Sequence, residues 1–197
     1  MKLHLTDSMF QQNIILGSGS PRRKELLALL GFTFTVKTKP TDESYPNTLA
    51  PQEVPIYLAK KKAAALLPDL AHDETLITAD TIVVLEGKIL GKPSSLEEAK
   101  NMLQQLSGKK HEVISGVYIK SARNEQEITV STDVYFKQLS QDEIEYYVTA
   151  YSPLDKAGAY GIQEWIGQIG VEKIHGSYYN VVGLPTEELW KILRRLS

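Results

Sequence analysis

Hydrophobic and polar positions near the start of the chain change from a strand pattern to a helix pattern. The apolar run Ile14-Ile15-Leu16 is short, partly β-branched and closed by Gly17, which predicts a buried strand. Ser20 then stands at an N-cap position before Pro21, and leucines recur at helical spacing until Gly31. The chain therefore begins with a strand, a glycine-serine turn and a helix.

The next segments give one more strand, a helix and a hairpin. Alternating Phe32–Thr38 predicts a second strand, and the polar stretch Lys39–Asn47 a loop. A helix opened by prolines runs through Leu66-Leu67, with Pro55 tolerated only near its first turn. Thr75–Leu85 is rich in Ile, Val and Thr and predicts a central strand, which turns at Glu86-Gly87 into a short partner at Lys88–Leu90.

The second half of the chain combines helices and strands. Capping boxes at Ser95–Glu98 and Ser140–Glu143 predict two helix starts. Between these helices, His111–Lys120 and Ile128–Phe136 are expected to form adjacent antiparallel strands. A last strand is expected at Tyr178–Val182, followed by a C-terminal helix containing Leu189, Ile192, Leu193 and Leu196. These elements predict an α/β fold with a mixed sheet.

Composition narrows the class of protein. The 197 residues suit one α/β domain or two small lobes sharing a cleft, and 42% hydrophobic residues argue against disorder. A net charge of -2 gives no support to a nucleic-acid binder, and the absence of cysteine excludes disulfides and thiolate metal sites. No apolar run reaches the length of a signal peptide or a membrane span, so the cytoplasm is the expected location.

The turn Ser18-Gly19-Ser20-Pro21-Arg22-Arg23 is the first candidate for chemistry. Small residues after a strand let backbone N–H groups approach an anion, and the helix N-terminus adds a positive dipole. Two arginines in the first helical turn are unfavourable beside that dipole unless something negative offsets them. A polyphosphate would do so, although an ordinary helix start with two solvated arginines fits the segment equally well.

Asp80 is the second candidate, because it is a carboxylate within an apolar, β-branched strand. Such a group must be paired, bind a metal or be buried at a cost. Asp80 is either a metal ligand or general base projecting into a cleft, or a carboxylate bonded to the backbone or to Thr78. The loop Asp42-Glu43-Ser44 offers further carboxylates that, with Asp80, suit Mg²⁺, although by itself it is typical of a solvated turn.

Three further sets of residues complete the candidates. Lys60-Lys61-Lys62 lies on a predicted helix, so at most two of these lysines face one site, and Lys92 is fixed between Gly91 and Pro93. In Asp155–Gln163, Tyr160 would stack on a base and Gln163 pair with its edge, unless the segment is a tight loop around a core tyrosine. His111 is interpreted as a structural hydrogen-bonding group at the start of a strand.

The order of these segments resembles the Maf family of nucleotide pyrophosphatases. The matching segments are Ser18–Arg23, Glu43, Leu58–Ala63, Ala79–Thr81, Gly91–Pro93, His111–Val117, Asp155–Gln163 and Asn180–Pro185. The resemblance implies one Maf-like domain over residues 1–197, with a twisted, ITPase-like mixed sheet, flanking helices and two lobes around a central cleft. It also implies a homodimer. The charge balance and the absence of a long apolar run predict that the protein binds neither nucleic acid nor membrane.

Carried over to this sequence, the resemblance implies that Asp80 is the proton acceptor that activates water. Ser18, Arg23, Lys62 and Lys92 match positions that bind the triphosphate, and Glu43 with Asp80 would hold a divalent metal, Mg²⁺ or Mn²⁺. Arg22, Thr81 and Gln163 match positions that separate substrate branches. Arg22 stands where the 7-methyl-GTP branch usually has tryptophan, so the chain resembles the dTTP/UTP branch.

Two departures from the family pattern stand near these residues. Gly17 replaces the usual alanine, and Glu164-Trp165 follows Gln163 where glycine is more usual, which bears on the shape of the base pocket. The expected activity is hydrolysis of dTTP and UTP to the monophosphate and pyrophosphate. A non-catalytic nucleotide- or protein-binding regulator of cell division, and a nucleotidyltransferase, are the alternatives.

Overall fold

The computed structural model describes residues 13–196, which divide into two compact units. The first unit contains the chain up to Asp80, the segment Ser115–Thr129 and the C-terminal segment from Gly183. The second contains Thr81–Ile114 and Val130–Val182. Three long strands pass from one unit into the other.

The described residues form a seven-stranded mixed sheet with the order β2-β1-β3-β5-β6-β7, and β4 pairs with β3. β1 is parallel to β2 and β3, whereas β4 is antiparallel to β3 and β7 is antiparallel to β6. The predicted α/β class with a mixed sheet is therefore confirmed. The strands are β1 (Asn13–Leu16), β2 (Phe34–Val36), β3 (Glu74–Leu85), β4 (Lys88–Leu90), β5 (Lys110–Lys120), β6 (Glu125–Phe136) and β7 (Val171–His175).

Helices flank these strands. They are α1 (Pro21–Leu29), α2 (Val54–Leu66), α3 (Leu96–Leu106), α4 (Gln141–Tyr151), α5 (Trp165–Gly170), α6 (Tyr178–Val182) and α7 (Thr186–Leu196), with short 3₁₀ turns η2 (Pro51–Glu53), η3 (Leu67–Asp69) and η4 (Ala157–Ala159). Within the described part of the chain, no helix is long and apolar enough to cross a membrane.

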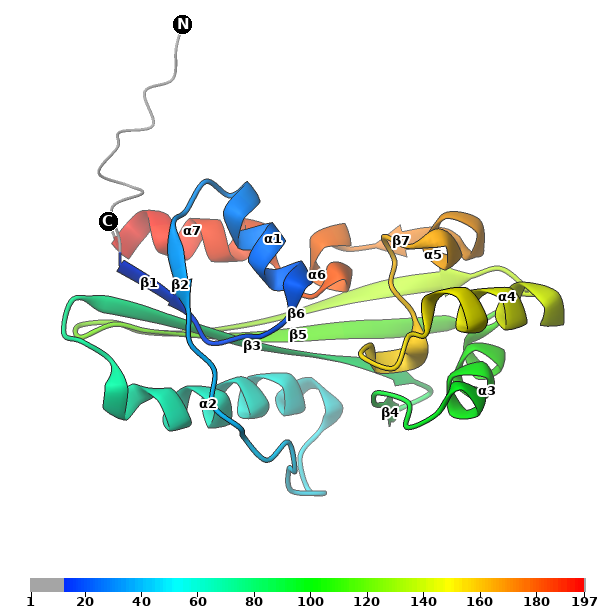
Figure 1. Cartoon of the computed structure of the whole chain (residues 1–197), viewed down its shortest axis with the longest axis horizontal. Coiled ribbons are helices and arrows are strands. Elements are labelled where there is room, and N and C mark those ends of the chain that lie inside the picture. The colour runs from blue at the N-terminus through cyan, green and yellow to red at the C-terminus, as the bar shows by residue number, and fades with distance from the viewer. Residues whose placement is uncertain (1–12, 197) are drawn as a thin grey trace, which may run out of the picture. The chain divides into compact units, whose positions relative to one another are not determined.

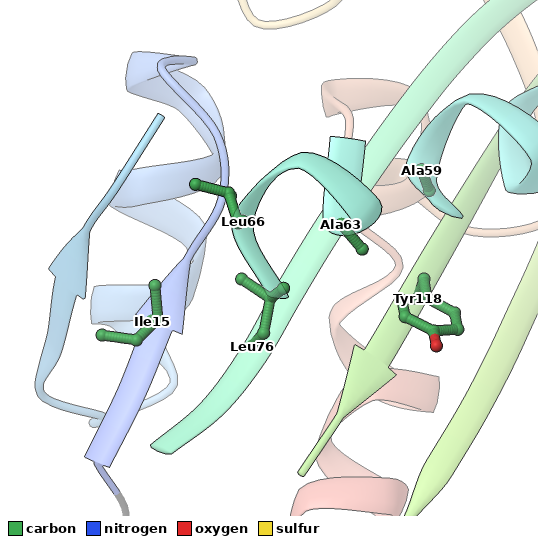
Figure 2. Close-up of a cluster of buried hydrophobic side chains, with 6 residues drawn as sticks. All are labelled: Ile15, Ala59, Ala63, Leu66, Leu76 and Tyr118. Carbon is green, nitrogen blue, oxygen red and sulfur yellow. The ribbon is translucent and has the colours of Figure 1, made fainter. Parts of the chain in front are cut away.

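In the first unit, α2 packs on one side of the strands and α1 and α7 lie on the other (Figure 1). Figure 2 shows the core beneath α2, which contains Ile15, Ala59, Ala63, Leu66, Leu76 and Tyr118. Both alanines are fully buried, and their small side chains let the helix axis approach the strands. At Gly116 of β5 the approach is closer still, because a Cβ there would lie 2.3 Å from the backbone nitrogen of Ile56.

In the second unit, α3 and α4 pack on each other. His111, Phe136 and Tyr160 form a buried edge-to-face aromatic cluster with ring centroids 4.9 to 5.4 Å apart. His111 Nε2 and the Tyr160 hydroxyl are hydrogen-bonded at 2.7 Å. The interpretation of His111 as a structural hydrogen-bonding group is therefore confirmed.

The predicted starts of the helices agree well with the structure. Ser20 caps α1, with Pro21 as its first residue, and Ser140 forms a full capping box with Glu143. At α3 the box is incomplete, because the Glu98 carboxylate accepts from Ser94 N at 2.7 Å rather than from Ser95. The second strand is shorter than predicted, since only Phe34–Val36 pairs with β1.

The predicted strand at Tyr178–Val182 is wrong, because these residues form α6. Aromatic and β-branched side chains favour a strand locally, but tertiary contacts override that preference here. The Asn180 amide group donates to Val113 O and to Thr132 Oγ1, both at 3.0 Å, and Ser177 Oγ accepts from Asn180 N. The sequence also failed to predict α5 and β7, which are both short.

Candidate active site

The turn between β1 and α1 is held by hydrogen bonds of its two serines. Gly17 N donates to Ile77 O at 2.8 Å, which keeps the turn against β3. Ser20 Oγ accepts from Arg23 N, and buried Ser18 Oγ accepts from Ser20 N at 3.3 Å. The turn is therefore rigid up to the first residues of α1.

Arg23 is anchored inside this turn. Its Nη1 donates to Ser18 Oγ at 3.2 Å and its Nε donates to Gly183 O at 2.9 Å. Burial lowers the pKa of Arg23, the charges of Asp80 and Glu43 oppose that shift, and the charge of Arg22 adds to it. Arg23 thus lies within electrostatic range of two carboxylates, whose charge offsets the unfavourable helix dipole at this position.

Asp80 and Lys62 meet through the contact of α2 with β3. Thr78 Oγ1 donates to Ala59 O at 2.8 Å, which fixes the helix on the strand. Asp80 is two residues after Thr78 on the same face of the strand, and Lys62 is three residues after Ala59 on the same face of the helix. Lys62 Nζ consequently donates to the Asp80 carboxylate, and the two side chains are 18% and 13% exposed. The alternative pairing of Asp80 with Thr78 is excluded, because Thr78 bonds to Ala59.

Glu43 reaches the same lysine from a loop. Its carboxylate lies 2.9 Å from Lys62 Nζ and is half exposed. Of the neighbouring lysines, Lys60 pairs with Glu127, and Lys61 donates to Asp42 Oδ2, Ser44 O and Ser44 Oγ. The three lysines therefore point to different places, as their spacing predicts.

Glu43 and Asp80 fit a divalent cation as part of its ligand set. Both turn a carboxylate oxygen toward one cationic atom, Nζ of Lys62, so their oxygens converge on a single point. Among the residues that the structure describes, no three or more His, Asp or Glu side chains form a metal-binding group. Mg²⁺ is commonly held by one or two carboxylates together with phosphate oxygens and water, which matches a pair of carboxylates.

The first unit thus brings together Ser18, Arg22, Arg23, Glu43, Lys62 and Asp80, six of the residues predicted from the sequence. Thr81, Lys92 and Gln163 belong to the second unit. There Gly158 N donates to Gly91 O at 3.0 Å, so the loop that carries Lys92 lies beside η4. Gln163 is exposed a few residues further along the chain.

Tyr160 does not present a stacking surface for a base. Its ring is 6% exposed and packs edge to face on Phe136 and His111. Burial raises the pKa of Tyr160, so its hydroxyl stays protonated beside His111. The interpretation as a tight loop around a core tyrosine is confirmed.

The sequence reasoning missed several residues that hold the candidate site in place. Gly183 supplies the carbonyl oxygen that accepts from Arg23, and nothing local in the sequence marks that role. Lys156, Glu164 and Tyr147 form a network around the segment that carries Gln163. The signal for Lys156 was a lysine within a run of small residues, which indicates burial with a partner.

Comparison with known proteins finds one matching family model and several similar proteins. A family model described as Maf-like protein matches residues 13–196. A dTTP/UTP pyrophosphatase of Phocaeicola vulgatus is 49% identical over 193 residues, covering 98% of this chain and 100% of the relative. Another of Bacteroides fragilis is 53% identical over 184 residues, covering 93% and 95%. A third, of Cytophaga hutchinsonii, is 48% identical over 194 residues, covering 98% and 86%.

Proposed function

We propose that this chain, which belongs to the Maf family, hydrolyses dTTP and UTP to the nucleoside monophosphate and pyrophosphate. The names of its relatives support the substrates. The proposal rests on one observation. The carboxylates of Asp80 and Glu43 both pair with Lys62 Nζ, and their charges also act on Arg23. A chain that merely bound nucleotides would have little use for two carboxylates near a polyphosphate, since they repel it unless a cation intervenes.

In this proposal the triphosphate is bound by the turn Ser18–Arg23 and by Lys62 and Lys92. Arg23 presents a rigid guanidinium, because Ser18 and Gly183 fix its orientation. Phosphate oxygens are well matched to a guanidinium fork and to the N–H groups at the start of α1. Lys62 adds a point charge. The resemblance to the family further assigns Lys92 to the phosphates, and Arg22, Thr81 and Gln163 to selection of the base.

Asp80 acts as the general base in this proposal. It takes a proton from a water molecule, and the water oxygen attacks the α-phosphorus. The bond from the α-phosphorus to its bridging oxygen breaks, and pyrophosphate leaves with the electron pair. Asp80 suits this role because it projects from a rigid strand, where its position relative to Lys62 is fixed.

Glu43 and Asp80 would hold a divalent cation, Mg²⁺ or Mn²⁺. Bound there, the ion would neutralise phosphate charge and polarise the reacting phosphorus. Lys62 Nζ balances the charge of the two carboxylates. The homodimer that the family resemblance implies stays a prediction, which light scattering on the purified protein measures directly.

A substrate panel tests the proposal. Purified protein is incubated with dTTP, UTP, 7-methyl-GTP and ATP in the presence of Mg²⁺, and the products are separated. We expect dTMP or UMP with pyrophosphate, and slower turnover of the two purine nucleotides. A nucleoside diphosphate with orthophosphate would refute cleavage at the α-phosphorus. Tight binding of dTTP without turnover in Mg²⁺ or Mn²⁺ would favour the non-catalytic regulator.

A further inference from the structure

In the second unit, Gln163 lies in a turn that is closed by a backbone hydrogen bond. Glu164 N donates to Gly161 O at 3.0 Å, so Gln163 projects from the middle of a tight turn. Gly161 and Ile162 are buried, whereas Gln163 is exposed. The position of the Gln163 backbone, from which the exposed side chain projects, therefore depends on what holds Gly161 and Glu164.

A single hydroxyl group holds both of those residues. Tyr147 of α4 is fully buried, and its hydroxyl accepts from Gly161 N at 3.0 Å while it donates to the Glu164 carboxylate. Burial and the bond to Glu164 raise the pKa of Tyr147, so the hydroxyl stays protonated and remains a donor at neutral pH.

Lys156 completes the network from the opposite end of the segment. Its Nζ lies 3.1 Å from Glu164 Oε1 and 2.7 Å from Asp155 Oδ1, and its side chain is only 10% exposed. The packing is tight, because a Cβ on Gly161 would lie 2.8 Å from Glu164 Cδ and 3.1 Å from Lys156 Cε.

Rigidity at this position matters because of the chemistry of a glutamine amide. The amide offers an acceptor on one side and a donor on the other, and rotation by half a turn exchanges them. Uracil and thymine present an N3–H donor beside a carbonyl acceptor at C4, whereas cytosine presents an N3 acceptor beside an amino donor. If the turn shifts, Gln163 can present either end of its amide to the base, so selection between the two bases requires the turn to be held in one place.

We propose that Tyr147, acting through Gly161 and Glu164, is a positioning residue that holds Gln163 for selection of uracil or thymine over cytosine. The inference rests on the proposed function, because it takes Gln163 as the residue that contacts the base. Tyr147 itself is buried behind the turn and acts through the backbone of the segment.

The test compares Tyr147→Phe with wild type, using UTP and CTP. We expect the ratio of kcat/KM for UTP to that for CTP to fall about tenfold, through a higher KM for UTP and with kcat nearly unchanged. Glu164→Gln, which retains an acceptor for Tyr147, is expected to keep the ratio within about threefold of wild type, because a neutral acceptor still holds the hydroxyl. Tyr151→Phe is the matched control, since Tyr151 lies in the same helix with its ring stacked on Tyr147.

Calorimetry gives the Kd values for UTP and CTP in the same proteins, and the ratio of these two values is a second measure of selectivity. Absence of turnover in the wild type would refute the proposed function, while the Kd ratio would still decide the inference. An unchanged UTP-to-CTP ratio in Tyr147→Phe, with or without a lower Tm, would overturn the inference. A tenfold loss of selectivity in the Tyr151→Phe control would overturn it as well.

Discussion

At the scale of single residues, Lys62 is the centre of the candidate site. Its ammonium group is shared by Asp80 from a strand and Glu43 from a loop, and it is mostly buried. A buried cation of this kind must keep its partners, because removing one leaves charge uncompensated. The charges of the same two carboxylates also reach Arg23, which explains how this arginine is tolerated in the first turn of α1.

Replacing Asp80 by asparagine tests the assignment of the general base. The amide keeps the shape and one hydrogen bond to Lys62, but it cannot take a proton from water. We expect kcat for dTTP to fall by about 100-fold or more, with a Tm below that of wild type because Lys62 loses one of its two charged partners. Asp73→Asn is the matched control, because Asp73 is an exposed carboxylate just before β3 that accepts from Asn13. Full activity in Asp80→Asn would remove the proposed base.

His111 makes the stability of the protein depend on pH. Burial lowers the pKa of His111 to about 4, and the charge of Asp133 opposes that shift. The unfolded chain, with a histidine pKa of about 6.5, therefore binds more protons than the folded chain between these values. The contribution of His111 to folding stability is fully present above about pH 6.5 and is lost as the pH falls toward 4.

The expected loss from this histidine between pH 7 and pH 5 is about 2 kcal/mol. Urea unfolding of wild type and His111→Gln at both pH values measures it, since contributions of other groups cancel in the comparison. The variant is expected to lose less stability on acidification than the wild type. Equal losses in the two proteins would show that His111 does not titrate in this range.

At the scale of elements, the placement of α2 decides whether the site forms. Thr78 ties the helix to β3, Ala59 and Ala63 let it approach, and Gly116 admits the backbone of its first turn. Local signals predicted the helix itself, namely the prolines at its start and its apolar spacing. They carried no information about Gly116, because the partner of that glycine is 60 residues away along the chain.

Substituting Gly116 by alanine should displace α2. The added Cβ would lie 2.3 to 2.6 Å from backbone atoms of Pro55 and Ile56, which cannot move aside like the end of a side chain. We expect a loss of about 3 kcal/mol in stability and a large loss of activity. Gly19→Ala is the control for stability, because a Cβ there meets nothing within 4 Å. A Tm equal to wild type in Gly116→Ala would contradict this packing.

Sequence reasoning succeeded at elements where local signals agree and failed where distant contacts decide. The strand, turn and helix from Ile14 to Gly31 were predicted correctly, because capping and periodicity point the same way. Tyr178–Val182 was predicted as a strand, and buried bonds of Asn180 make it a helix instead. The difference at Glu98 has a local cause instead, because Ser94 N and Ser94 Oγ donate to its carboxylate in place of Ser95 N.

At the scale of the whole molecule, the sequence predicted the mixed sheet but not its strand order. Pairing of β1 with β3, in which Asn13 pairs with Glu74 and Leu16 with Ile77, depends on contacts that no local pattern records. For the site, the residue types in the sequence predicted Asp80 and the turn Ser18–Arg23. The ion pair between Glu43 and Lys62 could be seen only in the folded structure. The supporting residues Gly183 and Tyr147 came only from the structure.

The most direct test of the account is hydrolysis of UTP in water enriched in ¹⁸O, followed by mass spectrometry of both products. Attack at the α-phosphorus predicts that the label enters UMP, with none in pyrophosphate. Label in pyrophosphate would mean attack at the β-phosphorus, and it would contradict the proposed attack on the α-phosphorus by the water that Asp80 activates.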